Sequence, residues 1–75
     1  MKIAEMKNGY LVNMFGEQID KEALESKIVK MLVKKAYKLE EKLEQAYREI
    51  DIKHIESEIA IIQSQIAIQL RNESM

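Results

Sequence analysis

The sequence contains no cysteine and no proline, and its only two glycines, Gly9 and Gly16, lie near the start. Without cysteine, disulfide bonds and thiolate metal sites are excluded, and nothing indicates an oxidising compartment. With no glycine or proline after position 16, the rest of the sequence has no linker or low-complexity tract. A length of 75 residues then allows one small domain. Such a domain buries only about 60% of its unfolded surface and is marginally stable alone.

A strong charge of one sign and a long apolar run are also missing. The formal net charge is −1 at pH 7, so the chain as a whole does not attract nucleic acid or anionic membrane. The N-terminal residues alternate polar and apolar side chains, unlike a signal peptide. The longest uncharged segment, residues 59–70, is shorter than the roughly 20 apolar residues of a transmembrane helix. We therefore expect a cytoplasmic protein without a membrane partner.

A turn signal near the N-terminus predicts a β-hairpin. Asn8-Gly9 is the pair favoured in a two-residue type I′ turn, because both positions need a positive φ. We predict strands over residues 2–7 and 10–15. Neither face of this ribbon is cleanly polar, and an isolated two-stranded ribbon is barely stable in water, so the hairpin must pack against a helix or join a sheet across a subunit boundary. A short N-terminal helix is the competing interpretation.

The next segment carries the signals of a long helix. Asp20 is a favourable N-cap, and Ile19 and Leu24 stand at the spacing of a hydrophobic staple. Apolar residues then recur every three or four positions, which is typical of coiled-coil-like packing against another helix. These residues are Val29, Leu32, Ala36, Leu39, Leu43, Ala46 and Ile50. We predict a helix over residues 20–49.

A second apolar stripe follows, and it is rotated relative to the first. It consists of Ile52, Ile55, Ile59, Ile62 and Ile66, while Ile61 and Ile68 lie on the opposite side of the same helix. At 100° per residue, the two stripes lie about 150° apart around one continuous helix. The chain therefore either breaks near residues 49–53 or continues as one helix over residues 20–72. Asp51 can cap a new helix, so we predict a helical hairpin with its second helix over residues 52–72.

The isoleucine-rich helix predicts self-association. A single small chain has few surfaces with which to cover two sides of one helix, so other copies of the chain are the expected cover. We therefore expect a homodimer or a higher oligomer. The predicted interface residues are Ile52, Ile55, Ile59, Ile61, Ile62, Ile66, Ile68 and Leu70.

A group of lysines on the first predicted helix is a candidate polyanion-binding site. It consists of Lys27, Lys30, Lys34, Lys35, Lys38 and Lys42. They fall within an arc of about 140° away from the apolar seam. Four of them repeat at i, i+4, a like-charge series that destabilises the helix slightly and that a phosphate backbone would offset. A solvated face, partly neutralised by nearby glutamates, is the alternative interpretation.

Residue types for catalysis or metal binding are sparse. His54 is the only histidine, and Asp51 and Glu58 flank it at helical spacing. A metal site would require carboxylates and histidines that converge from neighbouring subunits. No nucleophile stands beside a base at a recognisable spacing. We predict no metal, no cofactor and no enzymatic activity.

These observations together predict an α+β fold that is mostly helical, with a β-hairpin before two long helices. They favour a non-enzymatic oligomeric protein of the inhibitor or adaptor type, a regulatory protein that binds a macromolecular partner, for which another protein is the first expectation. The alternative is a helical hairpin that binds nucleic acid through its lysine-rich face. The sequence does not identify the partner.

Overall fold

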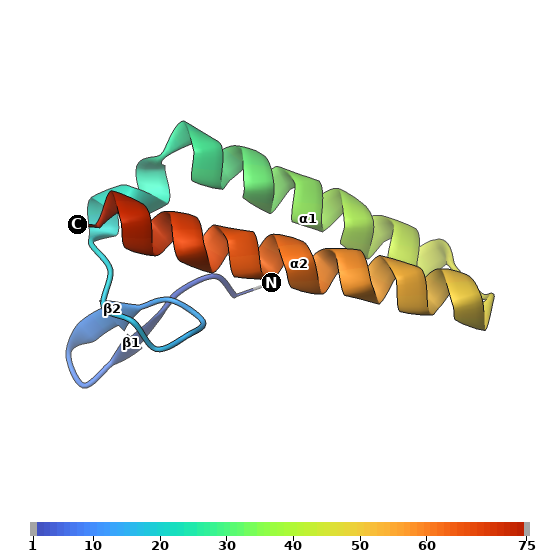
Figure 1. The fold of residues 1–75 in the computed structure, drawn as a ribbon, viewed down its shortest axis with the longest axis horizontal. Coiled ribbons are helices and arrows are strands. Elements are labelled where there is room, and N and C mark those ends of the chain that lie inside the picture. The colour runs from blue at the N-terminus through green and yellow to red at the C-terminus, as the bar shows by residue number, and fades with distance from the viewer. Residues whose placement is uncertain (1, 75) are drawn as a thin grey trace.

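The computed structural model describes residues 2–74, which form a β-hairpin, a short 3₁₀ helix and two long helices (Figure 1). In chain order these are β1 (Glu5–Lys7), β2 (Tyr10–Val12), η1 (Lys21–Glu25), α1 (Lys27–Gln45) and α2 (Glu49–Glu73). The two long helices lie side by side in opposite directions, and the β-hairpin lies beside the C-terminal half of α2. The predicted fold, a small β-hairpin before a helical hairpin, is confirmed. Within the described residues, neither helix combines the length and the apolar character that a membrane crossing requires.

The β-hairpin turns at Asn8-Gly9, as predicted. Asn8 has φ 53° and Gly9 has φ 83°, so both turn positions are left-handed. Glu5 pairs with Val12, Met6 with Leu11, and Lys7 with Tyr10. The competing interpretation of a short N-terminal helix is therefore wrong.

The strands are shorter than the predicted residues 2–7 and 10–15, because the chain turns a second time after Val12. Val12 forms an isolated antiparallel bridge with Gln18, and the Ile19 N–H donates to the Leu11 carbonyl at 2.9 Å. Residues 13–15 therefore do not extend the pairing with β1. Instead the chain turns back, and residues 18 and 19 pair with the other edge of β2.

The long helix begins later than predicted, at Lys27. Asp20 precedes η1 and makes no side-chain cap hydrogen bond. The N-cap of α1 is Ser26, whose Oγ accepts from the Val29 N–H at 3.4 Å. Ser26 is extended, at φ −59° and ψ 135°, so it separates the two helical segments. The change of chain direction at Ser26 allows Ala23 of η1 to be buried against the long helices.

The two long helices are separated at residues 46–48, so the alternative of one continuous helix is wrong. Ala46 and Arg48 are both extended, at ψ 135° and 131°. α2 starts at Glu49 with Arg48 as its N-cap, and Asp51 lies in the first turn instead of capping it. The break needs no glycine or proline because any L-residue adopts this extended backbone. Reversal of the chain there brings the two rotated stripes into contact.

The core lies between the two helices and η1. Its members are Ile19, Ala23, Val29, Ala36, Leu39, Ile59, Ile62, Ile66 and Leu70. Ile66 and Leu70 are the largest of the fully buried side chains, with 1% and 0% of their surface exposed. Ile3, Ala4 and Leu11 of the N-terminal segment pack against this cluster from outside. Most of each apolar stripe is therefore covered by the other within one chain, whereas Ile50 of the first stripe is 75% exposed.

Replacing Gly9 by valine should destabilise the protein. A β-branched residue is strained at φ 83°, and a left-handed non-glycine residue costs about 1–3 kcal/mol. A Cβ at this position meets nothing within 4 Å, so the loss is conformational and not steric. Gly9→Asn is the matched control, because asparagine tolerates this region better. The free energy of unfolding measures both variants, and equal losses would contradict the explanation.

Candidate interaction surfaces

The structure divides the predicted interface residues into two groups. Ile59, Ile62, Ile66 and Leu70 are buried inside the single chain, and Ile52 and Ile55 are half-buried. Ile61 and Ile68 remain 58% and 40% exposed. A contact between intact copies of the chain can therefore use the exposed pair directly, whereas the buried residues already pack in the core. Self-association itself stays a prediction.

A groove of about 420 Å³ runs along one side of the helix pair, and we call it the basic groove. It is lined by Lys35, Lys38, Leu39, Lys42, Glu58, Ile61, Ile62 and Gln65. α1 supplies all three lysines, and α2 supplies Glu58. Within residues 2–74, none of these lysines forms an ion pair. Glu58 Oε1 lies 3.0 Å from His54 Nε2. The α1 side of the groove is thus cationic, the α2 side carries both polar and apolar residues, and apolar side chains line the groove between them.

A second groove of about 430 Å³ lies between the same helices and carries the opposite charge. This acidic groove is lined by Glu40, Leu43, Glu44, Glu56, Ile59, Ala60 and Gln63. On each helix these residues fall on the other side of the core stripe from those of the basic groove. The helix pair therefore has one basic and one acidic side.

A third groove, of about 370 Å³, forms where the N-terminal segment meets α1. Ile3, Leu24, Val29, Val33 and Tyr37 line it together with Lys30 and Lys34. We call it the apolar groove. Its existence depends on three separate parts of the chain, so helical periodicity alone does not indicate it.

All six lysines of the candidate polyanion site are exposed, but they do not form one continuous face. Lys35, Lys38 and Lys42 line the basic groove, whereas Lys30 and Lys34 line the apolar groove. Lys30 also pairs with Glu25, with Nζ and Oε2 3.1 Å apart, and Lys27 is the first residue of α1. Two grooves thus divide the lysines that the sequence presents as a single stripe.

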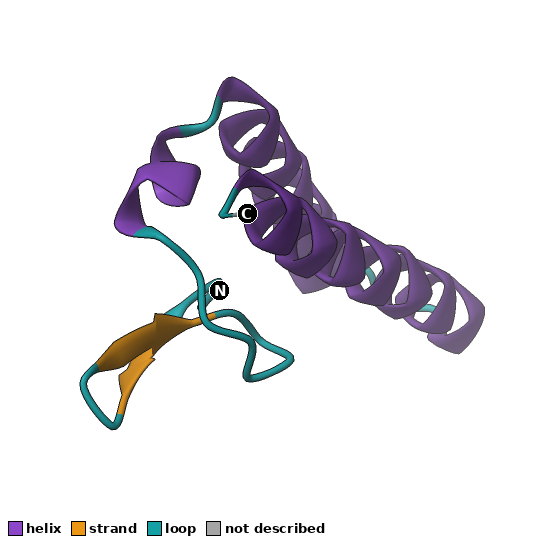
Figure 2. Cartoon of the chain, turned by 60° about the vertical axis from the view of Figure 1, so that its left-hand side comes forward, coloured by secondary structure: helices purple, strands orange, loops and turns teal. Residues whose placement is uncertain are grey.

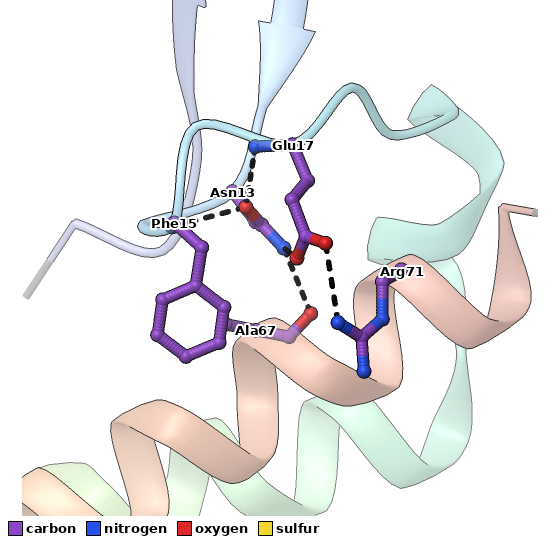
Figure 3. A network of polar contacts seen from close by, with 5 residues as sticks. All are labelled: Asn13, Phe15, Glu17, Ala67 and Arg71. Carbon is purple, nitrogen blue, oxygen red and sulfur yellow. Dashed lines mark hydrogen bonds and ion pairs between the residues drawn. The ribbon is translucent and has the colours of Figure 1, made fainter.

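The side chain of Asn13 links the loop after β2 to α2 through a hydrogen bond (Figure 3). Asn13 is 1% exposed. Its Oδ1 accepts from the N–H groups of Phe15 and Glu17, both at 3.0 Å. Its Nδ2 donates to the Ala67 carbonyl at 3.0 Å and to Glu17 Oε1 at 3.1 Å. The buried amide is therefore fully satisfied, and it joins segments 54 residues apart in sequence.

An ion pair continues this network to the end of α2. Arg71 Nη1 donates to Glu17 Oε2 at 3.1 Å. The pKa of Glu17 is lowered, first by the hydrogen bond from Asn13 and then by that from Arg71. The predicted strand over residues 10–15 conceals this role of Asn13. The signal that could indicate it is the Asn-x-x-Gly spacing of Asn13 and Gly16, typical of a tight turn.

The histidine lies on an exposed part of α2. His54 contacts Glu58. Within the described residues, no group of three or more His, Asp or Glu side chains is placed to hold a metal ion. The predictions of no cofactor and no enzymatic activity remain predictions.

Comparison of the chain with protein-family models, with curated proteins and with solved structures finds no match.

Glu17 should make the stability of the protein depend on pH. Because the folded state lowers its pKa from the ordinary 4.5, the carboxylate stabilises the fold above this pH, and the contribution disappears as the pH falls through the folded pKa. Glu17→Gln should therefore be less stable than the wild type at pH 7 and approach it at pH 3. Glu22→Gln, on the exposed surface of η1, is the control. Urea unfolding across pH measures this, and a gap between Glu17→Gln and the wild type that is constant with pH would contradict it.

Proposed function

We propose that this chain is a non-enzymatic interaction protein that acts as an oligomer and binds another protein, as an inhibitor or adaptor does. The observation that carries the proposal is the set of large apolar side chains left exposed on the two long helices. They are Ile28, Met31, Tyr37, Ile50, Ile61 and Ile68. Apolar surface gathered along helices and bordered by charge is typical of protein interaction sites.

The grooves give this surface a chemical preference. The apolar groove offers an almost entirely hydrophobic floor with Lys30 and Lys34 at its border. Long lysine side chains cover apolar surface with their stems and keep the ammonium in water. A partner segment with apolar anchors at helical spacing and neighbouring carboxylates therefore complements this groove. The proposed partner is a protein with an acidic amphipathic segment.

A nucleic-acid-binding protein is the second candidate. It is favoured by the exposure of all six lysines of α1, of which only Lys30 is held in an ion pair within residues 2–74. Phosphate contacts of this kind are independent of base sequence and weaken as salt rises. Division of the lysines between two grooves with apolar floors favours a protein partner instead.

Self-association should be measurable in solution. At micromolar concentration we expect the chain to sediment as a dimer or larger species, because exposed isoleucine and methionine side chains gain about 1.5–3 kcal/mol each on full burial. The midpoint of thermal unfolding should then rise with protein concentration. A cooperative monomer whose midpoint is independent of concentration would refute the oligomeric part of the proposal.

Electrophoretic mobility shifts with generic DNA and RNA separate the two candidate functions. We expect no salt-sensitive binding near 50 mM salt, because the net charge of −1 repels polyanions from most of the surface. If the second candidate holds, Lys30, Lys34 and Lys38 changed together to Gln should weaken binding and flatten the log–log salt slope by up to about 3. Gln at Lys7, Lys21 and Lys53, which are exposed outside the group, is the matched control.

A further inference from the structure

One side of the helix pair lacks a covering element. The loop after β2 contacts α2 at Ala67 and Arg71, and Figure 2 shows the β-hairpin on one side of the two helices. The basic groove lies on the other side and is lined only by residues of α1 and α2, as is the acidic groove. No other described segment between residues 2 and 74 closes it.

Exposed apolar side chains extend this open side beyond the groove. At 100° per residue, Ile28 and Met31 fall within an arc of about 80° on α1 that also contains Lys35, Lys38 and Lys42. Ile61 and Ile68 fall within a similar arc on α2 with Glu58 and Gln65. All four of these apolar side chains are at least 40% exposed. Ile50, 75% exposed, falls at the same angle on α2 as Ile68. α1 thus presents two large apolar residues beside its polar groove residues, and α2 presents three.

We propose that a second copy of the chain closes the basic groove, so that two helical hairpins form a four-helix bundle. The proposal rests on the self-association proposed above and specifies its geometry. Two hairpins packed face to face bury one further side of each helix, which is the usual way such pairs complete a core. A two-fold arrangement uses the same surface on both copies and closes the assembly at a dimer.

Charge selects the direction of the two-fold axis. The α1 lysines already stand across the groove from Glu58, at the same level along the helices. With the axis parallel to the helices, α1 of one copy covers α2 of the other, and Lys38 and Lys42 meet Glu58 of the second copy. With the axis perpendicular to the helices, α1 covers α1, and lysine meets lysine. Opposed like charges disfavour the second arrangement.

The acidic groove is the other surface that could attract the lysines of a second copy. That pairing joins different surfaces, does not close, and continues into larger assemblies. The apolar residues that line the acidic groove are Leu43, Ile59 and Ala60, and Ile59 is already buried in the core. Burial of large apolar side chains outweighs surface ion pairs, so the two-fold arrangement that covers the exposed residues of both copies is favoured.

The first test replaces Ile61 by lysine. Ile61 is 58% exposed in the single chain, so the fold should persist while the dimer dissociates, with a dissociation constant at least about 100-fold weaker, as for a central interface residue. Met6→Lys is the matched control, because Met6 on the β-hairpin is 68% exposed and lies outside the groove. Sedimentation and circular dichroism report assembly and folding separately. A dimer unaffected by Ile61→Lys would overturn the geometry and leave the proposed function standing.

The second test exchanges charges across the groove. One variant carries Lys38→Glu and Lys42→Glu, and the other carries Glu58→Lys. Each should self-associate at least about tenfold more weakly than the wild type, whereas their mixture should form a heterodimer in which every pair is again opposite in sign. Native mass spectrometry of the mixture, with one variant isotope-labelled, detects this species directly.

Glu56→Lys is the control for this exchange, because Glu56 lines the acidic groove two positions away on α2. Glu56→Lys keeps Lys38, Lys42 and Glu58, so in a heterodimer with the doubly substituted variant only one of the two contacts is opposite in sign. This heterodimer should form at least about tenfold more weakly than the one with Glu58→Lys. Heterodimers with Glu56→Lys that are as stable as those with Glu58→Lys, or wild-type assemblies that grow beyond a dimer, would overturn the two-fold arrangement in favour of basic-to-acidic stacking. A wild-type monomer would refute both this geometry and the proposed oligomer.

Discussion

The contact between the apolar stripes of α1 and α2 within one chain is the constraint on which the rest of the structure depends. Ile66 and Leu70 of α2 pack in the same cluster as Val29 and Ala36 of α1. Burial of one such isoleucine or leucine is worth about 1.5–3 kcal/mol, whereas a surface ion pair contributes about 0–1 kcal/mol. The core therefore fixes how the helices pair, and the charged residues occupy the positions that this pairing leaves outside.

The pairing of α1 and α2 leaves the helix pair with two different sides, one that carries the N-terminal segments and one that does not. The β-hairpin, the loop after it and the N-terminal segment are bound to the helices by packing of Ile3 and Leu11 on the core and by the hydrogen bond from Asn13 to Ala67. Because the β-hairpin, the loop after it and the N-terminal segment all lie on one side, the two helices are covered asymmetrically. The basic groove lies on the side that these segments leave uncovered, and the acidic groove is likewise lined only by α1 and α2.

The sequence predicts those features that depend on neighbouring residues. Asn8-Gly9 predicts the turn because its left-handed backbone is a local property, and the rotated isoleucine and leucine stripes predict the helical hairpin because periodicity is local as well. The start of α1 at Lys27 is not evident in this way, since Asp20 and Ser26 are comparable N-caps and the packing of Ala23 decides between them. The role of Asn13 depends on Ala67, which is far away in sequence.

The same distinction explains why the candidate sites could be predicted only in part. Periodicity indicates that Ile59 and Ile66 are buried, but not whether α1 of the same chain or a second copy covers them. Here α1 covers both, which leaves Ile61 and Ile68 as the exposed members of the predicted interface. The lysines likewise share an arc on an isolated helix. They separate into two groups only when α2 and the N-terminal segment form grooves on either side.

The apolar floor of the basic groove bears on which class of partner these lysines suit. An ammonium group attracts phosphate and carboxylate alike, so the charges of Lys38 and Lys42 do not distinguish nucleic acid from protein. Ile61 does, because a phosphate backbone that contacts the lysines gives this side chain nothing apolar to pack against. An amphipathic helix with a carboxylate beside its apolar residues satisfies both walls at once. α2 itself has this character, with Glu58 one turn before Ile61, so a second copy of the chain meets the chemical requirement of the groove.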